Sequence, residues 1–180
     1  MSTRLVILGL LMRERPLYGY EIKSIIEEQM GDWTNIAFGS IYFALGKLAD
    51  EGFVERVATE QEGKRPSRSI YQITDKGRDE FLRLLRQLWG GFDRQFFPFD
   101  IGLFFMNALP RDEILDYLDN RVTQLEMVLQ HLDEHQTEEM VNDEIPALAN
   151  AIFDHTRMHT QAELDWMKDL RGKVKTGEYD

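Results

Sequence analysis

The sequence has 180 residues, 43% of them hydrophobic and 29% charged, so it is long enough for one sizeable core or two small domains without metal or disulfide support. It contains no cysteine, which excludes disulfides, thiolate zinc sites and thiol nucleophiles. The net charge of -11 lies entirely in the second half, because residues 1–89 hold 13 Lys and Arg against 13 Asp and Glu. Only the first half is therefore suited to approach a polyanion such as DNA.

No segment is predicted to be a signal sequence or a membrane span. The apolar run at residues 5–12 is followed by charged residues and not by a small-residue cleavage site, so we interpret it as a buried helix. The Phe-rich region at 92–105 is interrupted by charges and a proline, well short of the ~18 apolar residues that a membrane-spanning helix needs. We expect a soluble, cytoplasmic protein with no membrane partner.

Three short helices are predicted before residue 53. The first is the run at 5–12, which stops before Pro16 because proline disrupts helical geometry. The second covers residues 18–31, and the third covers 40–52 with Ser40 as its N-terminal cap. The apolar residues of the second and third helices recur at steps of three and four: Ile22, Ile25, Ile26 and Met30, then Ile41, Leu45 and Leu48.

The pattern then changes to a period of two at residues 53–57 and 69–74, which predicts two strands. Residues 60–67 between them contain no apolar side chain but one Gly and one Pro, so we expect an exposed hairpin loop. A fourth amphipathic helix follows and ends at two consecutive glycines, Gly90 and Gly91, where we place the boundary between domains 1–89 and 90–180. Its apolar residues are Phe81, Leu82, Leu84, Leu85 and Leu88.

This order of helices and strands is the winged-helix arrangement, in which one helix presents side chains to the major groove of DNA. The third helix offers Ser40, Tyr42, Phe43 and Lys47 on the face that its apolar residues do not use. The loop acts as a wing. Its basic residues Lys64, Arg65 and Arg68 give a local positive potential, which phosphates feel within a Debye length of ~8 Å.

Four stretches carry motifs of a known family. They are Leu-Tyr-Gly-Tyr-Glu-Ile at 17–22, the segment 40–53, Gly-Lys-Arg-Pro at 63–66, and Tyr-Gln-Ile-Thr-Asp-Lys-Gly at 71–77. Together they resemble the PadR transcriptional regulators. The resemblance extends to 99–109 and 162–166, which are similar to the helical C-terminal region of one PadR branch. It implies a fold that is mainly α with a small β-wing: an N-terminal winged helix-turn-helix domain and a C-terminal α-helical coiled-coil dimerisation domain.

The resemblance also implies roles for individual residues. Tyr42 and Lys47 would face DNA from the recognition helix, and Tyr20 would support that helix from the one before it. The sequence departs from the family at two places, because Phe43 stands where proline is common and Gly46 where a basic residue is common. The full predicted DNA-binding set is Tyr20, Ser40, Tyr42, Lys47, Lys64, Arg65 and Arg68.

Two long helices are predicted in the acidic half. The first, between Pro110 and Gln136, carries an a/d heptad seam, and the second covers residues 145–174. They pair either within or between chains. A two-fold homodimer is expected because two winged helices on a palindromic operator multiply specificity. The seam residues of the first helix are Leu115, Leu118, Val122, Leu125, Leu129 and Leu132. In the second helix the residues that recur at the same steps are Leu148, Ile152, His155, His159, Ala162 and Trp166.

Histidines and aromatic residues in this half suggest ligand sites. His131 and His135, and likewise His155 and His159, have the i, i+4 spacing of helical metal ligands. Neither pair carries the Glu of a zinc-protease helix and no cysteine is available, so no metal site is predicted. The aromatic residues have two interpretations, ordinary core packing or a pocket for a small aromatic effector. The pocket residues would be Trp89, Phe92, Phe96 and Trp166.

No catalytic or cofactor motif is present: the sequence lacks a phosphate-binding Gly loop and a Ser or Cys nucleophile elbow. We therefore expect no enzymatic activity and no cofactor. The predicted function is a sequence-specific DNA-binding transcriptional regulator, a repressor relieved by a small molecule. The alternative is a protein-binding adaptor that keeps the winged helix as a scaffold and uses its acidic helices for partners.

Overall fold

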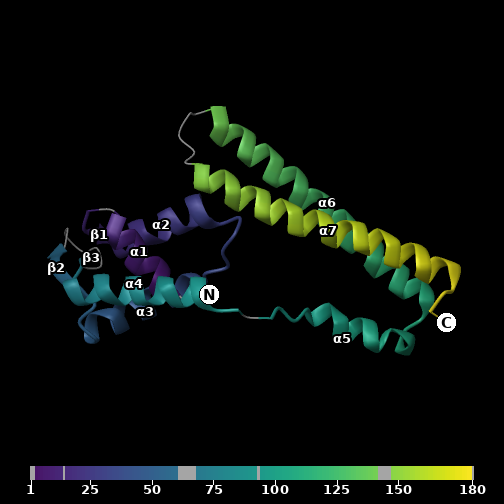
Figure 1. Ribbon diagram of the computed structural model, residues 1–180, viewed down its shortest axis with the longest axis horizontal. Helices are drawn as coiled ribbons and strands as arrows, with labels where there is room; N and C mark the ends of the chain where they lie inside the picture. The colour runs from purple at the N-terminus through teal and green to yellow at the C-terminus, as the bar shows by residue number, and fades with distance from the viewer. Residues whose placement is uncertain (1–2, 14, 61–67, 93, 142–146, 180) are drawn as a thin grey trace. The chain divides into compact units, whose positions relative to one another are not determined.

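The computed structural model describes the chain except for residues 1–2, 14, 61–67, 93, 142–146 and 180. The chain divides into two compact units, Met1–Asp93 and Arg94–Asp180 (Figure 1). Among the described helices, none has a stretch that is both long and apolar enough to cross a membrane.

The first unit has the order of elements that the sequence predicted, with one short strand added. A mainly helical fold with a small antiparallel sheet is thus confirmed. The elements are α1 (Thr3–Arg13), β1 (Leu17–Tyr18), α2 (Gly19–Met30), α3 (Phe38–Asp50), β2 (Val54–Glu60), β3 (Arg68–Ile73) and α4 (Asp75–Gly90).

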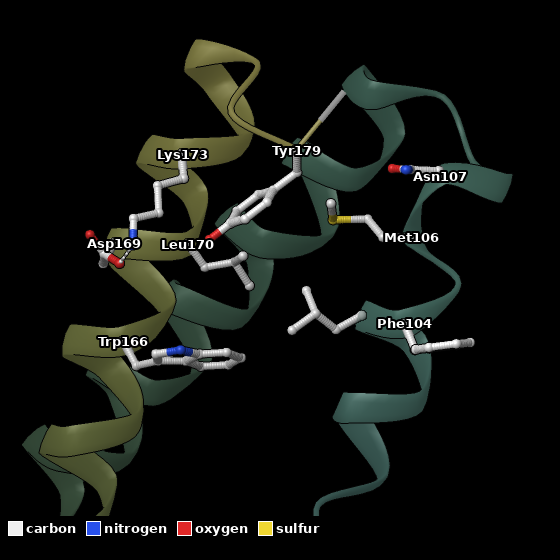
Figure 2. A pocket seen from close by; sticks show the side chains of 9 residues that line it. Phe104, Met106, Asn107, Trp166, Asp169, Leu170, Lys173 and Tyr179 are labelled. Carbon is white, nitrogen blue, oxygen red and sulfur yellow. Dashed lines mark ion pairs between the residues drawn. The ribbon is translucent and has the colours of Figure 1, made fainter.

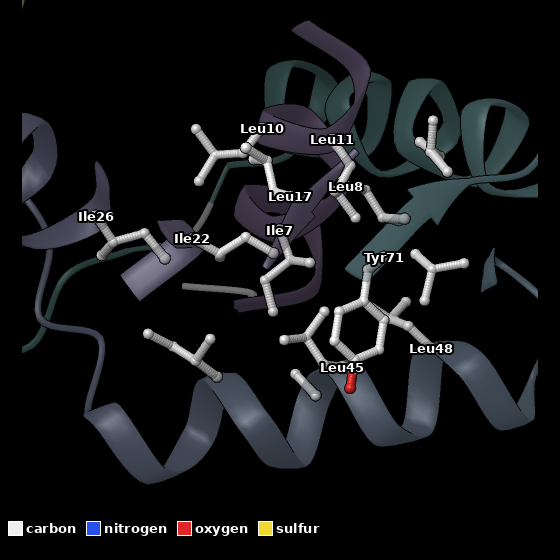
Figure 3. Close-up of a cluster of buried hydrophobic side chains, with 14 residues drawn as sticks. Ile7, Leu8, Leu10, Leu11, Leu17, Ile22, Ile26, Leu45, Leu48 and Tyr71 are labelled. Atoms are coloured by element: carbon white, nitrogen blue, oxygen red, sulfur yellow. The ribbon is translucent and has the colours of Figure 1, made fainter. Parts of the chain in front are cut away.

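The core of this unit is apolar and lies between α1, α2, α3 and the sheet. Figure 3 shows side chains from these elements pointing into one space. The predicted stripe of α3 is confirmed, because Ile41, Leu45 and Leu48 are fully buried. Burial of each such side chain contributes roughly 1.5–3 kcal/mol, so α3 is held firmly by one face. The buried residues are Ile7, Leu8, Leu10, Leu11, Leu17, Ile22, Ile26, Ile41, Ala44, Leu45, Leu48, Val54, Tyr71 and Ile73.

The sheet has three strands in the order β1-β3-β2, all antiparallel. β2 and β3 are the predicted hairpin. Val54 pairs with Ile73 at its open end, and Glu60 pairs with Arg68 at the end where residues 61–67 connect the strands. β1 was not predicted, because two residues are too few to show an alternating pattern. It pairs Leu17 with Tyr71 and so fixes the chain just before α2.

Helix α4 packs against α1 and the core through part of its apolar stripe. Phe81 and Leu84 join the core cluster, whereas Leu88 is exposed. Gly9 of α1 allows this contact, since a Cβ there would lie 3.0 Å from Phe81 Cε2. The helix ends at Gly90, and the N–H of Gly91 donates to the carbonyl of Gln87 at 3.0 Å.

An ion-pair cluster joins α1, α3 and α4. Arg4 Nη2 lies 2.7 Å from Glu51 Oε2 and 3.8 Å from Glu80 Oε1, and Arg83 Nε donates to Glu80 Oε2 at 2.7 Å. The hydrogen bond from Arg83 is the main cause that lowers the pKa of Glu80, and the one from Arg4 lowers the pKa of Glu51. Both carboxylates are therefore more acidic in the folded state than in the unfolded chain.

Acid is expected to weaken the fold through this cluster. Because the folded pKa values of Glu51 and Glu80 are lowered, the stability that these two carboxylates contribute is present above the ordinary glutamate pKa of about 4.3. It is lost as the pH falls through the lower folded values. Urea unfolding midpoints should be constant near pH 7 and fall below about pH 4.3. Glu80→Gln should be less stable than the wild type at pH 7, and its unfolding midpoint should fall less steeply as the pH is lowered. If its midpoint falls as steeply as that of the wild type, Glu80 does not contribute to the acid sensitivity.

The second unit consists of α5 (Pro98–Phe104), the short 3-10 helix η1 (Met106–Ala108), and the long helices α6 (Arg111–Val141) and α7 (Ala147–Thr176). α6 and α7 lie side by side and antiparallel within one chain (Figure 1). Intrachain pairing, one of the two options that the sequence left open, is thus observed. The α6 seam is confirmed: Leu118 and Leu132 are buried and the other seam residues are half-buried.

The face of α7 that contacts α6 is not the predicted one. Leu148 is 77% exposed, and His155, His159 and Ala162 are also exposed. The buried residues of α7 are instead Phe153, Leu164, Met167, Leu170 and Val174.

Candidate DNA-binding surface

Helix α3 has two distinct faces. One is buried in the core, and the other carries the exposed side chains of Tyr42, Phe43 and Lys47. These three residues lie within six positions of the helix, and Leu45 and Leu48 on its opposite face are buried in the core. The predicted recognition helix therefore presents a polar and aromatic surface on a rigid element.

Phe43 and Lys47 act as a pair on this surface. The Lys47 ammonium lies 4.8 Å from the centroid of the Phe43 ring, which is a cation–π contact one helical turn apart. The contact limits the directions in which Lys47 extends. Phe43 stands where the PadR pattern commonly has proline, and here it helps to position Lys47.

Tyr42 lies against the start of α2. A Cβ added at Gly19 would be 2.9 Å from Tyr42 Cε1, so the ring occupies space that only glycine leaves open. Tyr20 follows directly and is exposed, and its ring stacks on Tyr18 with centroids 5.3 Å apart. Gly19 at the start of α2 and Tyr42 on the exposed face of α3 are therefore in contact, and the supporting role of Tyr20 stays a prediction.

Replacing Gly19 with alanine is expected to displace the Tyr42 ring and to weaken binding of operator DNA. A loss of about tenfold corresponds to about 1.4 kcal/mol, which is within the range of one misplaced base contact. Gly172→Ala in α7 is the matched control, since an added Cβ there meets nothing within 4 Å. Both variants would be compared by fluorescence anisotropy on operator DNA, with circular dichroism to confirm folding. Equal affinities would show that the position of Tyr42 does not matter.

An ion pair that the sequence did not reveal fixes the approach to α2. Arg15 Nη2 donates to Glu21 Oε1 at 2.7 Å, and the N–H of Tyr18 donates to Glu21 Oε2 at 2.8 Å. The bond from Arg15 is the main cause that lowers the pKa of Glu21. Glu21 thereby closes the first turn of α2 and satisfies a backbone donor. The capping-box spacing of Glu21 was the signal that could have predicted it.

Ser40 is not the N-terminal cap that the sequence predicted. The helix begins at Phe38 with Ala37 as its cap, and Ser40 lies in the first turn. Its hydroxyl donates to the carbonyl of Ala37 at 2.6 Å. The serine therefore bonds back to the preceding turn and does not precede the helix, a frequent alternative for serine hydroxyls.

The wing residues lie mostly outside the described part of the chain. Lys64 and Arg65 belong to residues 61–67, and Arg68 is described only as the first residue of β3. The pairing of Glu60 with Arg68 places both ends of the connecting segment on neighbouring strands. The basic wing thus stays a prediction from the sequence.

The four residues predicted for an effector pocket differ in their surroundings. Trp89 and Phe92 belong to the first unit and are 84% and 92% exposed, so packing in the core of one chain is not their role. In the second unit Phe96 is exposed, and the Arg94 guanidinium lies 5.2 Å from its ring centroid. Trp166 meets Phe99 edge to face, with centroids 5.9 Å apart, and lines a cavity (Figure 2).

Comparison with known proteins gives matches over most of the chain. The family model described as the transcriptional regulator PadR-like family matches residues 7–83. A relative from Bacillus subtilis (strain 168), the negative transcriptional regulator PadR, is 29% identical over 156 residues, which cover 87% of this chain and 85% of the relative.

Solved structures share the fold. Bacillus subtilis PadR in complex with operator DNA has a TM-score of 0.71 at 24% identity, covering 95% of this chain and 98% of that chain. The complex of Bacillus subtilis PadR with p-coumaric acid has a TM-score of 0.69 at 22% identity, covering 96% and 98%. The virulence activator AphA of Vibrio cholerae has a TM-score of 0.78 at 18% identity, covering 97% and 99%.

These likenesses agree with the motifs of the sequence and with the geometry of the first unit. The match at residues 7–83 includes α2, α3, β2 and β3, the elements of the winged helix. Residues 7–83 are thus similar to the transcriptional regulator PadR-like family, and most of the chain is similar to the Bacillus subtilis regulator PadR.

Proposed function

We propose that the protein is a homodimeric, sequence-specific DNA-binding regulator of transcription that acts in the cytoplasm as a repressor. Residues 1–89 are its DNA-binding domain, and residues 90–180 are its dimerisation domain. The observation that carries this proposal is the exposed face of α3, where Tyr42, Phe43 and Lys47 stand on a helix whose other face is buried.

On DNA, α3 enters the major groove. Tyr42 and Lys47 contact bases and phosphates there. Ser40 contributes from the first turn of the same helix, and Tyr20 from the start of α2. The wing residues Lys64, Arg65 and Arg68 bind the neighbouring backbone. The Bacillus subtilis relative solved with operator DNA supports this assignment.

Dimerisation is supported by the apolar surface that one chain leaves exposed. Large apolar side chains are exposed on both sides of the boundary between the two units, and exposed apolar surface marks interaction sites in soluble proteins. A two-fold dimer would place two recognition helices on half-sites roughly 34–36 Å apart, which calls for a palindromic operator. The exposed side chains are Leu88, Trp89, Phe92, Phe96, Phe97, Ile101, Phe104 and Phe105.

A small aromatic effector relieves repression. The Bacillus subtilis relative supports this step, because it is named a negative regulator and was solved with p-coumaric acid. We assign Trp89, Phe92, Phe96 and Trp166 to effector binding. The Vibrio cholerae relative is named an activator, so activation of transcription is the alternative to repression. The proposal includes no catalytic activity, metal or cofactor.

Capture of genomic DNA tests the proposed function. Purified full-length protein is incubated with sheared DNA of its source genome, and the retained fragments are sequenced. We expect enrichment of a few promoter fragments that share an inverted repeat. If no fragment is enriched above the input, the DNA-binding proposal fails and the protein-binding adaptor becomes the better account.

Tyr42→Ala is expected to weaken operator binding more than binding to nonspecific DNA. Removing a side chain that contacts base edges should cost about 1–3 kcal/mol on the operator, whereas nonspecific binding depends on phosphate contacts. Tyr117→Ala, at an exposed tyrosine of α6, is the control. Anisotropy titrations on operator and scrambled duplexes measure both affinities. Equal losses on the two duplexes would show that Tyr42 does not read sequence.

A further inference from the structure

Phe43 is the most exposed large apolar residue among the described side chains of α3. It is 65% exposed, whereas Leu45 and Leu48 point from the same helix into the core (Figure 3). One exposed apolar residue is ordinary on a protein surface, so its neighbours decide what it does. Tyr42 and Lys47 contact DNA in the proposed function, and Phe43 lies with them on the exposed face. Its ring would therefore meet the DNA as well.

Two glycines flank Phe43 on this face. Gly39 lies one turn before it and Gly46 one turn after it, at spacings that place all three on one side of the helix. A Cβ added at either glycine meets nothing within 4 Å among the described residues, and neither glycine has a positive φ. Packing and backbone conformation thus do not require glycine there, although glycine weakens a helix relative to alanine. The missing side chains leave room on both sides of Phe43 for another molecule to approach the helix backbone closely.

The chemistry of the ring limits what Phe43 can recognise. The Lys47 ammonium lies over the ring, 4.8 Å from its centroid, and Phe43 is still 65% exposed in its presence. A phenyl ring carries no hydrogen-bond donor or acceptor, so it does not recognise phosphate oxygens or the polar groups of base edges. In the major groove, the apolar group that such a ring can contact is the C5 methyl of thymine. The adjacent ammonium suits an acceptor, such as a phosphate oxygen or guanine O6 and N7.

We propose that Phe43 reads thymine in the operator by contact of its ring with the C5 methyl group. Gly39 and Gly46 let α3 approach the bases closely enough for the ring to reach this methyl, and Lys47 contacts a polar group beside it. The inference rests on the proposed function, because it requires α3 in the major groove. It adds a base preference to each half-site, which a phosphate contact does not provide.

Replacement of thymine by deoxyuridine tests this contact, because uracil lacks only the C5 methyl. The operator is the inverted repeat recovered by capture of genomic DNA, and each thymine is replaced in turn at the equivalent position of both half-sites. The full-length wild-type protein should lose about fifteenfold in affinity at one such position at least, since each lost methyl contact weakens binding about fourfold. Fluorescence anisotropy measures the affinity for each duplex.

Variants at Phe43 identify the side chain responsible. Phe43→Ala should bind the thymine and deoxyuridine duplexes equally, because alanine is too short to reach the methyl. Phe43→Leu keeps an apolar side chain and should retain part of the preference for thymine. Tyr117→Ala removes an exposed aromatic side chain from α6 and should keep the full preference. The inference is wrong if no thymine position affects the wild type, or if Phe43→Ala prefers thymine as strongly as the wild type does.

Gly46→Ala tests the close approach of the helix backbone. The added methyl has room in the free protein, so the fold is retained, but operator affinity should fall about tenfold, as for one misplaced base contact. Gly172→Ala adds a methyl in open space on α7 and should bind like the wild type. Equal affinities of the two variants would contradict the close approach. The wild-type affinity for the operator relative to a scrambled duplex reports the proposed function separately: specific binding without a deoxyuridine effect overturns only the role of Phe43.

Discussion

Replacing Lys64, Arg65 and Arg68 together with alanine is expected to flatten the salt dependence of operator binding by about 3 units in the slope of log affinity against log salt concentration. Each phosphate contact releases about 0.9 counterion, so the loss of three contacts gives this change. Affinity should fall at low salt for both operator and nonspecific DNA, because phosphate contacts carry no sequence information. Titrations at several salt concentrations measure the slope directly.

A charge-matched control separates wing contacts from net charge. Arg157, Lys168 and Lys175 are exposed residues of α7, and their replacement by alanine removes the same three charges from the second unit. The control should leave the slope within about half a unit of the wild type, since distant charges are screened beyond a Debye length of ~8 Å. Equal slopes for the wing variant and the wild type would mean that residues 60–68 do not contact phosphate.

The helices of the first unit were predictable because their apolar residues follow one clear period. In α3 the pattern allows only one buried face, and Ile41, Leu45 and Leu48 occupy it. The start of the helix was harder to predict. Serine favours the position before a helix, but its hydroxyl bonds equally well to a preceding carbonyl, and only the path of residues 31–37 decides between the two.

The face of α7 could not be predicted from spacing alone. Two apolar stripes overlap along this helix, one ending at Trp166 and the other running from Phe153 to Val174. From Leu164 to Val174 the second stripe also follows steps of three and four residues, so periodicity in this part of the helix does not exclude it. The contact with α6 selects the second stripe. Trp166 then faces α5 and the cavity, which only the tertiary structure reveals.

Close approaches between distant segments were likewise beyond the sequence. The Tyr-Gly-Tyr motif suggested a supporting role for Tyr20, but not that Gly19 makes room for the Tyr42 ring. Residues 19 and 42 lie on different helices, and no local pattern links them. The residues proposed to face DNA were predicted from their type and their helix face, whereas the contacts that position them depend on how α2 and α3 pack.

Gly77→Ala is expected to destabilise the first unit by about 3 kcal/mol, near the upper end of what an overpacked site usually costs. Gly77 lies in the first turn of α4, where its N–H donates to Thr74 Oγ1 at 3.1 Å. The Thr74 hydroxyl in turn donates to the carbonyl of Gly52 at 2.8 Å. An added Cβ would overlap the carbonyl oxygen of Phe53 and lie 2.8 Å from Ile73 Cγ1.

The cost is large because the obstacle is backbone and the surrounding elements are fixed from several sides. Phe53 precedes β2 and Ile73 ends β3, so neither can move without disturbing the hairpin that carries the wing. Gly46→Ala is the control in the same unit. A Cβ there meets nothing within 4 Å, so this change inside α3 should stabilise by roughly 0.5–1 kcal/mol. Urea unfolding followed by circular dichroism should therefore move the two midpoints in opposite directions. If the unfolding midpoint of Gly77→Ala is at or above that of the wild type, the backbone at the junction between β3 and α4 can move to accept the added Cβ, and the predicted cost is wrong.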